Sequence, residues 1–201
     1  MAIEVTGALI WELATRSNLF KLLDFLSDKR KICPWLWLIG ILLLPVAQAT
    51  EVYLAPEQFL AETFGGNIPK PEALWIGKDM ARQAEAILGH APAQLRQRYW
   101  KERDKTVWIL EEIGKEELIT AGFVVAAGKI AQVKVLVYRE SRGWEIHYPA
   151  FLKQYEGIGL QPDYQLNRTI DGISGATYSV RAMGRMARLA LYYDHLSQEA
   201  K

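Results

Sequence analysis

The sequence has few of the residues from which metal sites and cross-links are built. Among its 201 residues there is one cysteine, Cys33, so neither a disulfide nor a thiolate metal site can form within the chain. The three histidines, His90, His147 and His195, are scattered and show no ligand spacing. We therefore expect no metal site.

The sequence also lacks the common signatures of a substrate-activating centre. It has no G-x-G-x-x-G fingerprint for a nicotinamide nucleotide and no cysteine after residue 49 to act as a nucleophile. No Ser-His-Asp arrangement is recognisable either. We expect no catalytic residues, and any redox or transfer chemistry would have to come from a bound group.

Charge of one sign is not in excess. Twenty-four basic and 23 acidic residues leave a formal net charge of +1. Nothing in this balance favours a polyanion, so we expect no nucleic-acid partner. The chain is long enough for one domain with a sizeable core plus an extra segment, and a second full domain is not expected.

No apolar run reaches the ~20 residues that a membrane-spanning helix needs. The longest one occupies residues 35–47, follows the basic triplet at 29–31, and ends in a small-x-small sequence at 47–49. These are the three parts of a secretory signal, with cleavage expected after Ala49.

Two arrangements of this segment remain open. In the first, residues 1–49 are an N-terminal extension and cleaved signal peptide, and residues 50–201 are a single periplasmic or extracytoplasmic domain. In the second, residues 34–49 stay as an anchor in the inner membrane. Because the basic flank faces the cytoplasm, residues from 50 onward lie outside it in both cases.

The part after residue 49 predicts an α+β fold, with an antiparallel sheet packed against helices and a C-terminal helix that covers one sheet face. Start and stop signals indicate two early helices, at 55–64 and 78–88. Runs of β-forming residues follow at 95–101, 106–112, 118–126 and 129–138. Short turns and no crossover helix separate these runs, so we expect an antiparallel meander.

Residues 171–193 begin as a loop and end as a helix. From Val180 onward, apolar residues recur at three- and four-residue steps, as in an amphipathic helix. The hydroxyls of Ser174, Thr177 and Ser179 could cap its start. A loop rich in glycine and hydroxyl groups before a helix also gathers free N–H groups, which suits a phosphate.

The same loop carries a resemblance to a known family. Ser174-Gly175-Ala176-Thr177, with Asp171 before it and Ser179 after it, resembles the flavinylation motif of the FMN-binding domain family. That family includes the FMN-bearing subunits of sodium-pumping NADH:quinone reductase and of Rnf-type complexes. The resemblance implies a phosphoester bond between FMN and Thr177, made by a separate flavin transferase that uses FAD.

The resemblance extends weakly upstream. Gly128-Lys129-Ile130 and the strand that ends at residue 138 look like the corresponding parts of the family. Family members often carry Thr-Pro-Gly after the glutamate that follows this strand, whereas this chain has Ser-Arg-Gly after Glu140.

The resemblance and the charged residues near the motif together give a set of expected cofactor-binding residues. Thr177 is the covalent site, and the others are Ser174, Gly175, Ala176, Asp171, Ser179, Arg181, Arg168, Glu140 and Arg142. Asp171 is a candidate for recognition by the transferase or for a turn hydrogen bond. Arg142, Arg168 and Arg181 are the candidate cations near the phosphate. We expect Glu140 to accept a hydrogen bond from loop backbone or to pair with Arg142.

The expected function is an exported flavoprotein that relays electrons between redox partner proteins, soluble or membrane-bound, after maturation by a flavin transferase. Trp144 and Tyr148 could stack on the flavin, or belong to a small satellite core. Two alternatives are a periplasmic flavin-dependent reductase of a small molecule, and a flavin-free binding module whose loop hydroxyls only cap the helix.

Overall fold

The computed structural model describes residues 50–199. The predicted signal or anchor segment lies outside these residues. Within the described part, no helix is both long and apolar enough to cross a membrane.

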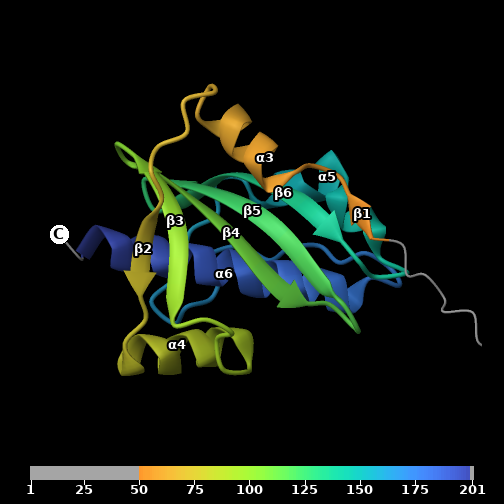
Figure 1. The fold of residues 1–201 in the computed structure, drawn as a ribbon. Helices are drawn as coiled ribbons and strands as arrows, with labels where there is room; N and C mark the ends of the chain where they lie inside the picture. Colours follow the sequence, from red (N-terminus) through yellow and green to blue (C-terminus); the bar gives the residue numbers. More distant parts are fainter. Residues whose placement is uncertain (1–49, 200–201) are drawn as a thin grey trace, which may run out of the picture. The chain divides into compact units, whose positions relative to one another are not determined.

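The centre of the fold is one six-stranded antiparallel sheet (Figure 1). Its strands are β1 (Glu51–Val52), β2 (Glu72–Trp75), β3 (Arg96–Glu102), β4 (Lys105–Ile113), β5 (Leu118–Ala126) and β6 (Lys129–Tyr138). They lie in the order β1-β6-β5-β4-β3-β2. The predicted meander is therefore confirmed as β3 to β6. Strand β2 was not predicted, because four residues directly after a proline-rich loop are too few to show alternation.

The helical elements are α3 (Pro56–Thr63), α4 (Lys78–Leu88), η1 (Trp144–His147), α5 (Pro149–Leu152), η2 (Lys153–Tyr155) and α6 (Thr177–Glu199). Helix α4 has the predicted bounds and ends at Gly89, whose φ of 84° is the left-handed conformation typical of a helix end. The α+β class is confirmed.

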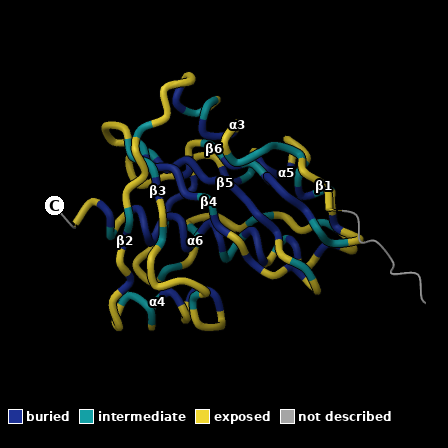
Figure 2. The backbone as a smooth tube through the Cα atoms, viewed as in Figure 1, coloured by how far each residue is buried: buried dark blue, intermediate teal, exposed yellow. Residues whose placement is uncertain are grey.

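Helix α6 packs along one face of the sheet, against β4 and β5 (Figures 1 and 2). Its buried stripe includes Met183, Met186 and Ala190, none of them exposed. Trp108 of β4 lies between Tyr99 and Tyr193, with ring centroids 4.6 Å and 5.7 Å away. Burying each large apolar side chain stabilises the fold by about 1.5–3 kcal/mol, so this core fixes the position of α6.

Helix α3 covers the opposite face with a smaller core. The Phe59 ring lies directly over Gly122 of β5, where a methyl group would come within 2.3 Å of Phe59 Cε1. Leu60 and Phe64 complete this contact with Val124 and Leu136. Helices thus cover both sheet faces. The start of α6 lies at one end of the strands, beside the β4–β5 turn and the loop after β6.

Candidate functional site

Helix α6 starts within the motif itself. The Ala176 carbonyl accepts the first helical hydrogen bond, from the Val180 N–H at 2.9 Å, so Ala176 occupies the N-cap position and Thr177 is the first helical residue. Before it, the Ala176 N–H donates to the Ile173 carbonyl at 3.0 Å. Gly175 stands third in this four-residue turn with a φ of 81°, as a type II turn requires.

The position of Ala176 can be compared with the alternative in which the loop hydroxyls only cap the helix. An alanine at the N-cap has no side-chain acceptor, and the Thr177 and Ser174 hydroxyls are exposed and make no hydrogen bond within the described residues. The N–H groups of Thr177, Tyr178 and Ser179 likewise have no partner among residues 50–199. The positive end of the helix dipole therefore faces outward beside a free threonine hydroxyl.

The third hydroxyl, that of Ser179, is buried and has a structural role. Tyr138 donates its phenolic proton to the Arg142 carbonyl, so Tyr138 Oη accepts from Ser179 Oγ, 3.0 Å away. Burial raises the pKa of Tyr138, which keeps that proton in place. Gly143 fits against the same pair, since a methyl group there would lie 2.8 Å from Ser179 Oγ. The loop after β6 is thus fastened to the start of α6.

A pocket of about 580 Å³ opens between these elements. It is lined by Lys115, Glu116, Glu140, Ser141, Arg142, Gly175, Ala176, Thr177, Tyr178 and Ser179. Its volume lies in the range of cofactor and ligand sites. Lys115 Nζ is ion-paired with Glu116 Oε1 at 2.8 Å, so Arg142 and the free helix N–H groups are what make the pocket suitable for a phosphate group.

Glu140 would oppose an anion, but its carboxylate is already engaged. Its Oε1 accepts hydrogen bonds from the backbone N–H groups of Lys115, Glu116 at 2.7 Å and Glu117 at 3.0 Å. The bond was predicted from the backbone of the loop that Glu140 itself opens, whereas the observed donors belong to the β4–β5 turn. The predicted alternative, an ion pair with Arg142, is absent from the described residues. Glu140 therefore joins the β4–β5 turn to the end of β6.

The structure brings six of the predicted site residues to this pocket: Glu140, Arg142, Gly175, Ala176, Thr177 and Ser179. Arg168 and Arg181 instead line a second, open groove farther along α6. Asp171 is exposed, with its backbone N–H donated to Gln154 Oε1 at 2.7 Å, and it lines neither depression, nor does Ser174. The cofactor roles of these four residues stay predictions.

Sequence reasoning missed Lys115, Tyr138 and Tyr178. Lys115 stands in a turn whose closeness to the motif depends on strand register. Tyr178 is 54% exposed beside Thr177 and could flank a flavin ring. Trp144 and Tyr148, each 43% exposed, contact each other edge to face with ring centroids 5.4 Å apart, outside the main core, and neither lines the pocket.

The comparisons with known proteins agree with this geometry. The sequence model of the FMN-binding domain family matches residues 114–192, a stretch that includes every residue lining the pocket. No curated protein matches the chain. The suspected family resemblance is confirmed, and the match supports a flavin-binding protein with FMN as its cofactor.

Proposed function

Because residues 114–192 match an FMN-binding domain, we propose that this protein is an exported flavoprotein that carries FMN covalently on Thr177 and relays electrons between redox partners. When bound, the flavin supplies the capacity to accept and return electrons in single or paired steps. The chain's own residues hold the phosphate end and leave the ring accessible from outside.

One observation carries the proposal. The Thr177 hydroxyl lies exposed at the edge of the pocket, makes no hydrogen bond within the described residues, and stands at the free N–H end of a 23-residue helix. A capping threonine would have its oxygen engaged with the helix backbone. A hydroxyl left free at a helix start can instead become the oxygen of a phosphoester whose charge the helix end stabilises.

Attachment by a flavin transferase balances with FAD as the donor. Thr177 Oγ loses its proton to a base and forms the new bond to the phosphorus of the FMN half. The bond from that phosphorus to the bridging oxygen breaks, and AMP leaves with that oxygen. Arg142 and the three free N–H groups would then offset the phosphate charge that remains, whereas Lys115 is paired with Glu116.

A covalent bond suits an exported protein. Outside the cytoplasm no flavin pool replaces a lost cofactor, and a single bond prevents its loss by dilution. This compartment is inferred from the basic flank, apolar core and small-x-small end of residues 29–49.

The test is denaturing electrophoresis under ultraviolet light of protein exported together with a flavin transferase. We expect a fluorescent band for the wild type, no fluorescence for Thr177→Ala, and an undiminished band for the matched control Thr169→Ala, an exposed threonine that does not line the pocket. A dark wild-type band, in a host whose transferase labels a control protein, would contradict covalent attachment.

A further inference from the structure

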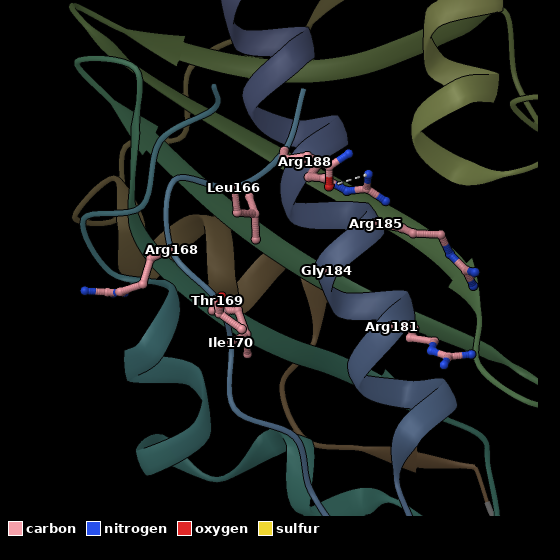
Figure 3. Close-up of a pocket in the computed structure, with 9 residues that line it drawn as sticks. Leu166, Arg168, Thr169, Ile170, Arg181, Gly184, Arg185 and Arg188 are labelled. Carbon is pink, nitrogen blue, oxygen red and sulfur yellow. Dashed lines mark hydrogen bonds between the residues drawn. The ribbon is translucent and has the colours of Figure 1, made fainter. Parts of the chain in front are cut away.

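A second depression, of about 500 Å³, lies between the outer side of α6 and the loop at residues 165–170 (Figure 3). It is lined by Gln165, Leu166, Arg168, Thr169, Ile170, Arg181, Gly184, Arg185 and Arg188. Four of these nine residues are arginines and none is acidic. We call this depression the arginine groove.

Three of the four arginines, all except Arg185, have no acidic partner among residues 50–199. Arg185 lies 2.9 Å from the buried carboxylate of Glu112. Arg188 donates instead to the Ile87 carbonyl at 2.8 Å, and Arg168 to two further carbonyls. Neutral carbonyls fix a guanidinium without cancelling its charge. The side chain of Arg181 has no ion-pair or hydrogen-bond partner among residues 50–199.

The arginines of the groove also lie close enough to affect one another. Burial lowers the pKa of the Arg188 guanidinium, and the nearby charge of Arg185 lowers it further. The groove therefore brings together Arg168, Arg181 and Arg188, which no acidic side chain among residues 50–199 neutralises, beside Arg185, which Glu112 does.

Gly184 is the second unusual feature. It lies in the interior of α6, where glycine costs about 1 kcal/mol relative to alanine. A methyl group at this position would meet no atom within 4 Å, so neither core packing nor backbone conformation requires glycine. Its effect is to leave the backbone of α6 open to close approach in the middle of the groove.

The arginine groove continues from the flavin pocket. Thr177, Arg181, Gly184 and Arg188 follow one another at steps of four, three and four residues, which places them on one side of the helix. Arg181 is about 6 Å along the helix axis from Thr177, and Arg188 about 16 Å. Anything that lies in the groove is held beside the cofactor site.

We propose that the arginine groove binds an acidic, extended segment of a partner protein. We identify this protein with the redox partner, an identification that rests on the proposed electron relay. The groove is open to solvent, whereas sites for small molecules enclose most of the ligand. Figure 3 shows the heads of Arg181, Arg185 and Arg188 on one side of α6 and Arg168 beyond the loop on the other. Such spread cations match a row of carboxylates better than one compact anion.

The chemistry favours this occupant. Guanidinium groups form two parallel hydrogen bonds with a carboxylate, which gives strength and orientation. A chain of Glu or Asp residues could follow the groove floor over Gly184 while its side chains reach the arginines on both sides. Charge complementarity of this kind favours fast, short-lived association, as electron exchange requires.

The test uses the full-length protein and a fluorescein-labelled hexaglutamate peptide, with binding followed by fluorescence anisotropy at low ionic strength. Arg181→Gln removes one unpaired cation, and Gly184→Leu fills the groove while adding a better helix former. We expect Arg181→Gln to bind about tenfold more weakly, the loss of one charge-assisted hydrogen bond, and Gly184→Leu to bind about tenfold more weakly because its side chain occupies the groove floor. Arg98→Gln, an exposed arginine on β3, is the control with the same change in net charge and is expected to bind like wild type.

Three results would overturn the proposal. The first is that Arg98→Gln weakens peptide binding as much as Arg181→Gln does. The second is that Gly184→Leu, with the circular dichroism of the wild type, binds the peptide as tightly as the wild type. The third is that the protein binds phosphatidylglycerol vesicles more tightly than the peptide and that Gly184→Leu abolishes this binding, which would assign the groove to a membrane surface.

Flavin attachment to the wild-type protein, measured beside peptide binding, separates this proposal from the proposed function. Peptide binding by wild-type protein that gains no flavin from the transferase would refute the covalent site and leave the groove standing. Flavinylated wild-type protein that does not bind the peptide would refute the groove alone.

Discussion

Two regions along helix α6 are rich in cationic side chains, and they differ in the groups that surround these side chains. At its start, Arg142 and the Lys115–Glu116 ion pair line a pocket that also holds a free hydroxyl, free N–H groups and the Glu140 carboxylate, which backbone N–H groups engage. In the arginine groove, the heads of Arg181, Arg185 and Arg188 lie on one side of an open helix backbone and Arg168 lies beyond the loop on the other, and the lining has neither a carboxylate nor a helix end. The first set of groups can hold one phosphate; the second can hold only a longer anionic chain. Charge alone therefore does not identify a site.

Among the variants that test this difference between the two regions, Gly143→Ala is expected to have the largest effect. The new methyl group would lie 2.8 Å from Ser179 Oγ and 2.9 Å from Tyr138 Oη, at a φ of 87°. We expect the free energy of unfolding to fall by about 2–3 kcal/mol and flavin attachment to fall with it, since the loop no longer seats on α6.

Gly157→Ala is the matched control for that experiment. Its φ of 76° imposes similar backbone strain, but a methyl group there has no neighbour within 4 Å. Urea unfolding should show a loss of about 1 kcal/mol and normal flavin attachment. Equal losses for the two variants would mean that the packing of Gly143 on α6 does not matter.

The next effect separates the two cationic regions directly. We expect Arg142→Gln to slow flavin attachment about threefold to tenfold, because one charge near the phosphate is removed. Arg181→Gln, one turn beyond Thr177 and outside the pocket, should leave the rate unchanged. Band fluorescence after short reaction times with purified transferase and FAD measures both. The reverse order of effects would place the phosphate in the groove.

Gly184→Ala should raise stability, which is unusual for a substitution next to a binding surface. Alanine is the better helix former, and the added methyl group meets no atom within 4 Å. Thermal unfolding should show a gain of about 1 kcal/mol with flavin attachment unchanged. A loss of stability would show that glycine is needed for packing after all, and would remove one argument for the groove.

The smallest expected effect is on the pH dependence of stability at Glu112, the carboxylate that pairs with Arg185 of the arginine groove. His90 Nε2 lies 3.0 Å from Glu112 Oε1, and this hydrogen bond raises the pKa of His90. The native state thus holds the His90 proton more firmly than the unfolded state, where the pKa is about 6.5. The resulting stability is complete below that pH and is lost as the pH rises through the native pKa.

Because His90 is half exposed, we expect less than about 1 kcal/mol from this contact. His90→Gln should lose stability relative to wild type at about pH 6 and match it at about pH 9, in urea titrations at each pH. A difference that grows with pH would have the wrong sign and would refute the pairing.

Local patterns predicted much of the fold. Helix α4 and strands β5 and β6 have the expected bounds, because glycine or a tight turn limits each one. The start of α6 was left open among three cap candidates, Ser174, Thr177 and Ser179, whereas the N-cap is Ala176, a residue type that gives no capping signal. The motif was recognised because its residues are contiguous.

The rest of the site depends on long-range contacts. Glu140 meets the N–H groups of residues 115–117 only because β4, β5 and β6 pair in one register. Arg168 and Arg181 looked close to the motif in sequence. The path of the loop and the 3.6-residue helical turn place them on the groove instead, and no local pattern reports such a separation.

The most direct measurement is mass spectrometry of a tryptic digest of the flavinylated protein. Trypsin cuts after Arg168 and Arg181, so residues 169–181 form one peptide that contains Ser174, Thr177 and Ser179. We predict that this peptide gains the mass of one FMN less one water, and that fragmentation places the gain on Thr177. An unmodified peptide from yellow protein, or a gain located on Ser174, would contradict the assignment of Thr177.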